Sequence, residues 1–247
     1  MIEKRHLGHA PIKEALIDIQ VTFPEKVTVE ALNSQYDVQI ADQYPKHETL
    51  QRGEFGIHNE DGKPTTVTIG QSVVGYRFSS EDGQRVVQFR IDGFTFSRLE
   101  PYDTWEEMRD EAARLWNIYL EAASPDSVTR VGTRYINMLK LPLPVDLKDY
   151  LTAPPAIPPG LNQELGSFLT RIQIRDPDIG AQGFLTQALE GVHDNYAPIV
   201  LDIDVFMAHQ FDDPHEETVW QCLEQLRHFK NEVFFESITE KTAELCK

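Results

Sequence analysis

Hydrophobic and polar positions repeat one order of elements twice along the chain. In residues 1–124, an alternating strand over 15–23 and an amphipathic helix over 27–42 precede further strands and a long closing helix. The further strands cover residues 50–57, 65–70, 74–80 and 85–99, with Asp82-Gly83 as a tight turn before the last of them. This part of the chain is therefore predicted to be an antiparallel meander that a helix closes.

The same order returns in residues 125–247. The predicted elements are a strand over 128–141, a short helix over 146–151, strands over 167–175, 183–190 and 199–207, and a second long helix. Four prolines and a glycine in residues 152–160 predict an irregular connection after the short helix.

Capping residues indicate where both long helices begin. In the first unit, the side chain of Asp103 or Thr104 can accept hydrogen bonds from the first helical turn. In the second unit, Asp213 is the predicted cap, Pro214 the first helical residue and Glu216 the capping-box partner. Each helix then presents one broad apolar face, which has to be buried against a sheet.

The repeated order predicts an α+β fold of two units, residues 1–124 and 125–247, packed as one body. The units could pack side by side, or they could share one curved antiparallel sheet with both long helices on its convex side. The second arrangement resembles the duplicated saddle of the TATA-binding-protein-like fold. This is a likeness of fold and carries no function with it.

Composition narrows the class of protein. The chain has 23 Lys and Arg against 40 Asp and Glu, for a formal charge of −17. A surface this negative repels nucleic-acid phosphates and anionic lipids. No run of about 18 apolar residues occurs, the N-terminus is charged, and Cys222 and Cys246 belong to no metal or redox motif. We expect an acidic, soluble, cytoplasmic protein with free thiols, without membrane or nucleic-acid partners.

Charged side chains recur on one face of the predicted strands. The six residues are Arg130, Arg134, Asp202, Asp204, Asp18 and Arg90. Alternate residues of a strand point the same way, so the two arginines of the second unit share a face, as do its two aspartates. If the first and last strands of each unit are neighbours, these groups form cross-strand ion pairs worth roughly 0.2–1 kcal/mol each. The other interpretation is a concave ligand site where the arginines hold an anionic group.

The sequence gives weaker signals for a metal site or a catalytic site. Metal-ligand residue types are densest at Asp202, Asp204, His209, Asp212, Asp213 and His215. They show no metal-binding spacing, so we expect no metal and no cofactor. His193-Asp194 reads as a solvated turn rather than a catalytic dyad, because adjacent turn residues seldom face one another. No phosphate-binding glycine motif and no catalytic residue is predicted, which favours a protein that is not an enzyme.

Several segments together are similar to a known group of proteins. They are residues 10–15 (APIKEA), 102–105 (YDTW), 130–137 (RVGTRYIN), 149–151 (DYL), 226–230 (LRHFK) and 234–239 (FFESIT). On these segments the chain resembles a sporadically distributed bacterial protein family of uncharacterised function and of about this length. The resemblance implies one full-length unit, and the family's patchy occurrence implies an accessory or defence-related gene cluster. It implies no activity, cofactor or catalytic residue.

The sequence therefore favours a non-enzymatic binding or protein-interaction module. Phe229, Phe234 and Phe235 exceed what one helix stripe needs, which predicts a surface for a protein partner or for a second copy in a homodimer. Two alternatives stay open. One is an enzyme that acts on a small anionic or phosphorylated substrate at the arginine-lined sheet face, and the other is an acidic mimic of nucleic acid that docks on a basic partner.

Overall fold

Nine antiparallel strands of the described chain form one sheet that contains strands from both predicted units. The strands are β1 (Ile12–Thr22), β2 (Lys46–Glu60), β3 (Lys63–Ser79), β4 (Arg85–Arg90), β5 (Gly93–Leu99), β6 (Ser127–Pro142), β7 (Phe168–Asp176), β8 (Ala181–Leu189) and β9 (Tyr196–Met207). Their order across the sheet is β2-β3-β4-β5-β1-β6-β9-β8-β7. With the helices described below, the protein has a mixed α+β fold.

The computed structural model describes residues 7–22, 28–60, 63–161, 166–189, 191–193, 195–211, 213–214 and 217–247. For residues 54–60 and 63–69 it describes the backbone.

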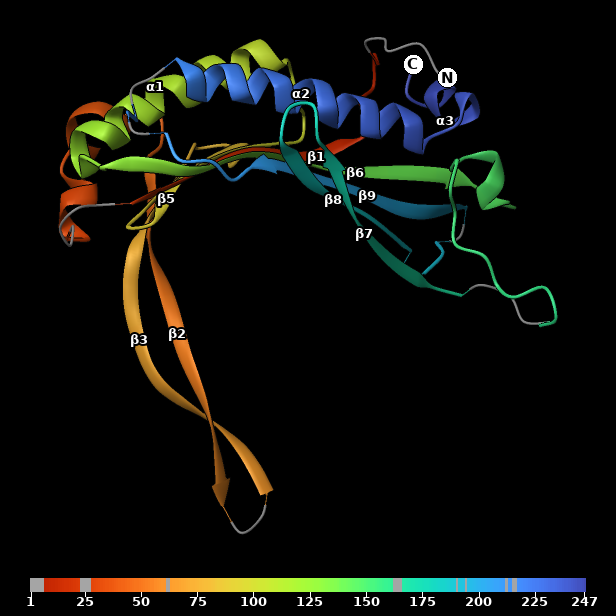
Figure 1. Ribbon diagram of the computed structural model, residues 1–247, viewed down its shortest axis with the longest axis horizontal. Coiled ribbons are helices and arrows are strands. Elements are labelled where there is room, and N and C mark those ends of the chain that lie inside the picture. The colour runs from red at the N-terminus through yellow and green to blue at the C-terminus, as the bar shows by residue number, and fades with distance from the viewer. Residues whose placement is uncertain are drawn as a thin grey trace.

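Two long helices, α1 (Trp105–Ala123) and α2 (Thr218–Ser237), lie along one side of the sheet, with the short helix α3 (Glu240–Glu244) at the end of α2 (Figure 1). Helix α1 contacts β5, and α2 contacts β6 and β9. The β2–β3 hairpin extends from the sheet on the side away from the helices (Figure 1). Within the described residues, no helix is both long enough and apolar enough to cross a lipid bilayer.

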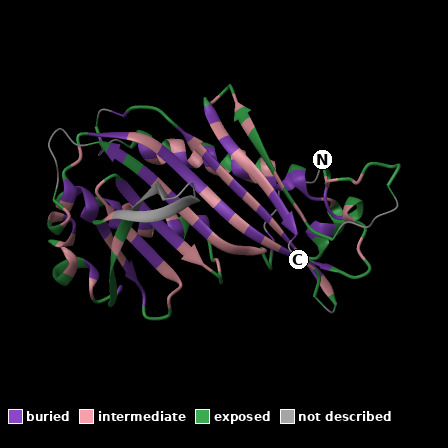
Figure 2. Ribbon diagram, turned by 90° about the horizontal axis from the view of Figure 1, so that it is seen from below, coloured by how far each residue is buried: buried purple, intermediate pink, exposed green. Residues whose placement is uncertain are grey.

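Alternation along the central strands determines which face of the sheet is buried. Ile17 in β1 and Val131 in β6 are inaccessible to solvent, whereas the neighbouring Asp18 is only partly buried. Viewed from the side away from the helices, the strands carry alternating bands of buried and partly buried residues (Figure 2). Met108 of α1 and Leu223 of α2 are 3% and 0% exposed, so both helices bury their apolar faces.

The first long helix begins where the sequence predicts. The Thr104 hydroxyl accepts the backbone N–H of Glu107 at 3.2 Å and caps α1. At the other end, Ser124 adopts a left-handed conformation with φ of 46°, and its N–H donates to the carbonyl of Leu120. This is a usual way to end a helix, because it satisfies a terminal carbonyl group.

The second long helix begins later than predicted. Its N-cap is Glu217, so the assignment of Asp213 as cap is wrong. Pro214 lies in the preceding turn and is buried, and its carbonyl oxygen accepts the indole N–H of Trp116 at 3.2 Å. This hydrogen bond holds the turn against α1 and delays the start of α2. Glu216 lies outside the described residues.

The helix predicted over residues 27–42 is wrong in extent. The described chain forms a 3₁₀ turn at Glu30–Asn33 and a π turn at Tyr36–Ile40, and neither has a side-chain cap. A helix this short and uncapped gains little from its own hydrogen bonds, so packing against the core determines its form. Leu32 and Ile40 are each 1% exposed and provide that packing.

The single strand predicted over residues 85–99 is two strands. The chain reverses after β4 and returns as β5, with Arg90 paired to Gly93. Gly93 has φ of 157°, and a Cβ atom there would lie 2.3 Å from the carbonyl oxygen of Ile19. Glycine therefore permits both the reversal and the close contact with β1.

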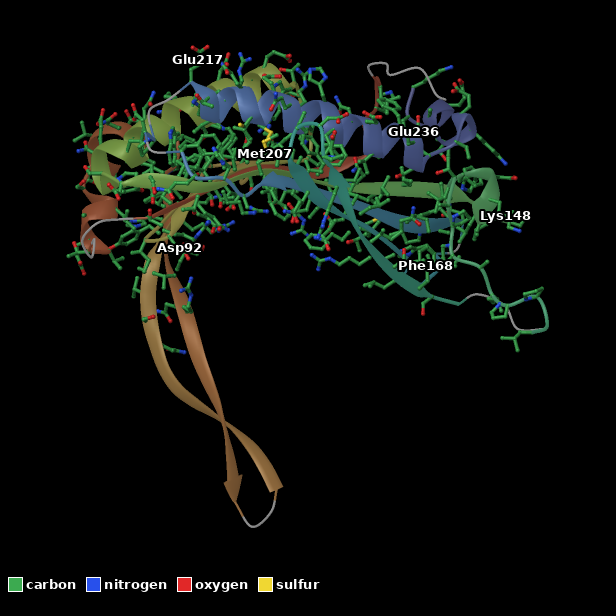
Figure 3. The ribbon with its side chains drawn as sticks, in the orientation of Figure 1. Asp92, Lys148, Phe168, Met207, Glu217 and Glu236 are labelled. Atoms are coloured by element: carbon green, nitrogen blue, oxygen red, sulfur yellow. The ribbon has the colours of Figure 1, made fainter. Side chains whose placement is uncertain are left out.

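The hairpin separates from the sheet at Gly75. β3 pairs with β4 only from Gly75 to Ser79, whereas it pairs with β2 along its whole length. A Cβ atom on Gly75 would lie 2.1 Å from the carbonyl oxygen of Phe89. Asp92 lies at the point where the hairpin leaves the sheet (Figure 3). The close backbone contact at Gly75 thus fixes the root of the hairpin.

Gly75→Ala is expected to lower the free energy of unfolding by about 2 kcal/mol, because β3 and β4 would have to separate to admit the methyl group. Gly70→Ala is the matched control: no atom lies within 4 Å of its added Cβ. Its effect should stay within about 0.5 kcal/mol. Urea denaturation followed by circular dichroism measures both variants, and equal stability of the two would contradict the close contact at Gly75.

Candidate functional site

The charged residues predicted for the sheet face lie together, and Arg130 is at their centre. Its Nη1 lies 2.8 Å from Oδ2 of Asp18 in β1, and its Nη2 lies 3.4 Å from Oδ1 of Asp204 in β9. β6 runs between these two strands, so one guanidinium group reaches both. The group also lies 4.3 Å from the ring centroid of Phe206 and packs over Gly132, where a Cβ atom would approach Nη1 to 3.0 Å.

Asp18 extends the interaction towards the hairpin. Its Oδ1 accepts hydrogen bonds from Nη2 of Arg90 at 3.0 Å and from the hydroxyl of Thr95 at 2.8 Å. Arg90 also pairs with Asp92 at 3.1 Å, and Asp92 pairs with Arg52 of β2 at 2.8 Å. The sequence placed Arg90 on the strand beside β1. It lies instead on β4, one strand further away, and its side chain reaches across β5.

Arg134 and Asp202 form the most direct ion pair of the group. The backbone partner of Arg134 is Asp204, yet its guanidinium donates to both oxygens of Asp202, at 2.8 and 2.7 Å. The pair is therefore diagonal across the β6–β9 ladder. These hydrogen bonds raise the pKa of the Arg134 guanidinium. Burial raises the pKa of Asp204, against the opposing effect of the two arginines.

The whole set, which we call the charged ladder, is balanced in charge. Its members are Arg52, Arg90, Arg130, Arg134, Asp18, Asp92, Asp202 and Asp204. With as many aspartates as arginines, an incoming anion would have to displace a carboxylate from its partner. The contacts match the ion-pair interpretation, and a ligand-binding role for these residues stays a prediction.

Asp18→Asn removes the carboxylate between Arg90 and Arg130 and leaves two like charges facing each other. The Asp18 side chain is 17% exposed. The free energy of unfolding should therefore fall by about 2–3 kcal/mol. Asp92→Asn is the control, since that side chain is 50% exposed. Its loss should stay below about 1 kcal/mol. Chemical denaturation at low salt measures the free energy of unfolding of both variants. Equal decreases would contradict the conclusion that Asp18, at the centre of the ladder, is shielded from solvent.

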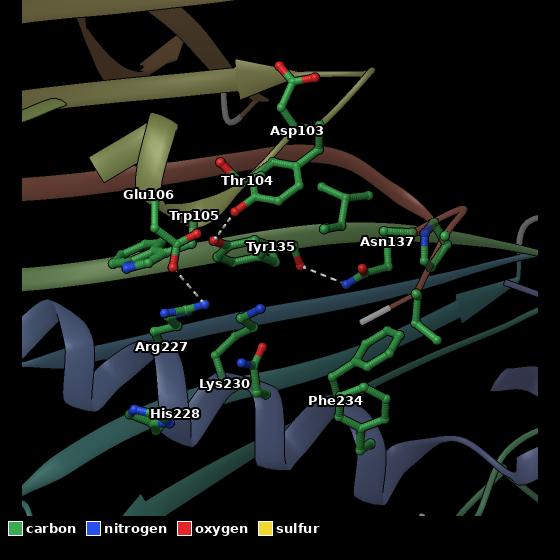
Figure 4. Close-up of a pocket in the computed structure, with 18 residues that line it drawn as sticks. Asp103, Thr104, Trp105, Glu106, Tyr135, Asn137, Arg227, His228, Lys230 and Phe234 are labelled. Carbon is green, nitrogen blue, oxygen red and sulfur yellow. Dashed lines mark hydrogen bonds and ion pairs between the residues drawn. The ribbon is translucent and has the colours of Figure 1, made fainter. Parts of the chain in front are cut away.

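A cavity of about 610 Å³ lies on the helix side of the sheet (Figure 4). It is formed by the start of α1, the middle of α2, the helix-facing side of β6 and the segment that leads into β1. Residues that determine its chemistry are Tyr102, Trp105, Glu106, Tyr135, Arg227 and Lys230. Five of the six segments that carry the family resemblance contribute to its lining: 10–15, 102–105, 130–137, 226–230 and 234–239.

Lys230 is the unusual group of this cavity. It is 9% exposed and points from α2 towards Tyr135, with its Nζ 3.6 Å from the centroid of that ring (Figure 4). Of the described residues, none offers a carboxylate or a hydrogen-bond acceptor to this ammonium group. Burial, with a smaller effect from Arg227, lowers the pKa of Lys230 to about 7.

Two tyrosine hydroxyl groups meet at the cavity wall that faces Lys230. The hydroxyl oxygens of Tyr102 and Tyr135 lie 3.1 Å apart, and their rings pack edge to face. Burial raises the pKa of both phenols. Both therefore stay protonated at neutral pH, and one hydroxyl proton remains available to a ligand after the other has joined the pair.

Arg227 lies on α2, three residues before Lys230, and is paired with carboxylates, whereas Lys230 has no such partner among the described residues. Its guanidinium lies 3.3 Å from Glu106 and 3.4 Å from Glu224. Glu224 accepts the indole N–H of Trp105 as well, at 2.6 Å. Glu106 and Glu224 are thus already engaged, and within the described part of the chain Lys230 contributes a positive charge that no carboxylate compensates.

Sequence reasoning missed this lysine, although the chain contains a signal for it. Leu223, Leu226, Lys230 and Phe234 follow one another at helical spacing, so the lysine occupies a position of the apolar stripe. A charged side chain at such a position is buried, or extends its charged end to the surface, or has a function.

The surface predicted for a partner at the C-terminal aromatic residues is not exposed. Phe234 and Phe235 are 7% and 8% exposed and line the cavity. Phe229 is partly buried and packs against the same core. Phe234 and Phe235 therefore provide no exposed apolar surface, while a protein partner and a homodimer stay predictions.

The described residues among the metal-ligand types identified in the sequence are not gathered into a site. Among the residues that the structure describes, no group of three or more His, Cys, Asp and Glu side chains is placed to hold a metal ion. Asp212 and His215 lie outside the described residues, as does Asp194. His193 stacks on Tyr196, with ring centroids 4.8 Å apart.

Comparisons of the chain with protein-family models, with curated proteins and with solved structures find no match. The family resemblance therefore stays a prediction, and the geometry of the chain itself has to carry the functional argument.

Lys230→Met is expected to stabilise the protein at pH 6 by about 1–3 kcal/mol, because it removes a buried charge that has no ionic partner among the described residues. The folded protein releases the Lys230 proton near pH 7, whereas the unfolded chain holds it up to about pH 10.5. Wild-type stability therefore gains from this group as the pH rises between those values, and the advantage of methionine should shrink by pH 9.

Urea denaturation at pH 6 and pH 9 measures this difference. Lys140→Met is the control, because Lys140 is exposed and lies 5.7 Å from the Tyr196 ring centroid. It should change the free energy of unfolding by less than about 0.5 kcal/mol at both pH values. A pH-independent effect of Lys230→Met would contradict a buried, partnerless ammonium group.

Proposed function

We propose that this protein is a non-enzymatic binding protein that holds a small organic anion in the cavity between α1, α2 and β6. The observation that carries the proposal is the ammonium group of Lys230, which is 9% exposed, lies against Tyr135 and has no anionic partner among the described residues. An isolated buried charge is unfavourable, and a carboxylate or phosphate oxygen at hydrogen-bond distance would compensate it.

The dimensions and the walls support a small ligand. A volume of about 610 Å³ falls within the range of about 300–1,000 Å³ that is usual for small-molecule sites. Tyr102, Trp105 and Phe234 present aromatic surface, which favours a ligand with a planar or apolar part beside its anionic group. The formal charge of −17 opposes anions at long range, so recognition has to come from contacts inside the cavity.

The charged ladder is a weaker candidate for the same task. Each of its arginines already contacts a carboxylate, so an anionic or phosphorylated substrate would find no uncompensated positive charge there. The same pairing weighs against the hypothesis that the protein mimics nucleic acid through this face, since a mimic presents unpaired negative groups. We therefore assign the anion to the cavity.

We also infer that the two halves of the chain are duplicated units in a TATA-binding-protein-like arrangement. β1 pairs with β5 and β6 pairs with β9, so each half joins its first strand to its last. β1 and β6 pair with each other at the centre of the sheet. In both halves the long helix follows the last strand. The halves differ in strand number, with β1–β5 in the first and β6–β9 in the second.

Mandelate, an aromatic carboxylate, is a suitable probe for the proposed site. Isothermal titration calorimetry at low salt should show binding to the wild type and a Kd about 10–100-fold weaker for Lys230→Met, since a charge-assisted hydrogen bond contributes about 1.5–3 kcal/mol. Lys140→Met should bind as the wild type does. Equal affinity of wild type and Lys230→Met, or binding to neither, would contradict the proposal.

A further inference from the structure

We infer that Lys230 forms a reversible imine with a 2-oxo acid held in this cavity. The inference rests on the proposed function, since the carboxylate of the acid is the anion that the site binds. It adds covalent capture through a carbonyl group, which anion binding alone does not require.

The environment of Lys230 is that of an amine rather than of a surface ammonium group. The side chain is 9% exposed, its nitrogen lies 3.6 Å from the centroid of the Tyr135 ring, and no carboxylate of the described residues pairs with it. Charged groups near it come from α2 and α1: Arg227 is held by Glu106 and Glu224 and adds repulsion. The lowered pKa agrees with this geometry, because an appreciable fraction of the amine is neutral near pH 7. A neutral, desolvated lysine amine is the nucleophile that carbonyl compounds require.

The reaction balances without another reactant. The lone pair of Nζ attacks the carbonyl carbon and forms a C–N bond, while a proton moves from nitrogen to the former carbonyl oxygen. The resulting hydroxyl group then leaves as water with the second amine proton, and the C=N bond forms. Hydrolysis reverses the same steps and releases the 2-oxo acid.

Neighbouring groups fit the remaining parts of the ligand. The paired hydroxyl groups of Tyr102 and Tyr135 belong to the same cavity and can donate a proton to the departing oxygen. The first turn of α1, from Trp105, also lines the cavity, and a helix N-terminus favours a carboxylate. The carboxylate can therefore lie at this N-terminus while the adjacent carbonyl faces Lys230.

Phenylglyoxylate and mandelate form a matched pair of probes. They share the phenyl ring and the carboxylate, but only phenylglyoxylate has a carbonyl that can form an imine. The protein is incubated with each probe and sodium cyanoborohydride, which reduces an imine to a stable secondary amine. Intact mass and peptide mapping should then show one adduct with phenylglyoxylate, with about tenfold or more labelling at Lys230 than at Lys140. Mandelate should give no adduct.

Two variants separate reactivity from folding. Lys230→Met and Lys230→Arg should both lose the adduct, and the arginine variant keeps a positive charge at the position. Lys140→Met should be labelled as the wild type is. Urea denaturation checks that each variant is folded.

Each outcome has a definite meaning. If mandelate binds in calorimetry but phenylglyoxylate leaves no adduct at Lys230, the imine inference is overturned and the proposed function stands. If neither compound binds, the proposed function fails and the imine fails with it. Labelling that persists in Lys230→Met, or that is spread evenly over the lysines, would also overturn the inference.

Discussion

The antiparallel pairing of β1 with β6 is the constraint on which both sites depend. Its register runs from Ile12 opposite Asn137 to Thr22 opposite Ser127, with Asp18 opposite Gly132. On one face of the sheet this register brings Asp18 within reach of Arg130. On the other face it brings the beginning of β1 beside Tyr135 and Asn137, where the cavity forms. A slip of one residue would exchange the two faces of β1, burying its charge and exposing its isoleucines, so burial and ion pairing specify the same register.

Partly buried charges are paired with opposite charges in the charged ladder, whereas Lys230 on the other face of the sheet has no such partner among the described residues. In the charged ladder, each partly buried guanidinium faces a carboxylate, and the side chains of Asp18 and Asp202 are 17% and 14% exposed. Such pairs add little net stability relative to apolar residues, but removing one member is unfavourable, so the ladder enforces strand register more than it adds free energy. At the cavity, Lys230 is buried with an aromatic ring in place of an anion. A cation–π contact at a desolvated site recovers on the order of 2 kcal/mol of what desolvation removes.

Much of the fold follows from local pattern, while the site depends on contacts between distant segments. Period-two alternation predicted that Arg130 and Arg134 share a face, and capping residues predicted the start of α1. Asp213 and Pro214 form an equally good local start signal, which the hydrogen bond from Trp116 overrides. The diagonal pairing of Arg134 with Asp202 reflects how side chains lean across neighbouring strands, which residue spacing does not encode. The cavity draws its lining from segments as distant as Pro11 and Lys230, so periodicity within one element could not predict it.

The unfavourable environment of Lys230 links ligand binding to stability. A methionine or leucine would suit its place on the apolar stripe without any desolvation penalty, so packing alone does not account for a lysine there. On the proposed function, a bound anion would compensate this charge only in the folded state, because the unfolded chain leaves the ammonium in water. Binding of an anion in the cavity should therefore stabilise the fold by an amount that grows with the ligand concentration relative to Kd. On the proposed function, the empty site is the less stable state, and this difference in free energy would favour a negatively charged ligand in a protein whose overall charge is −17.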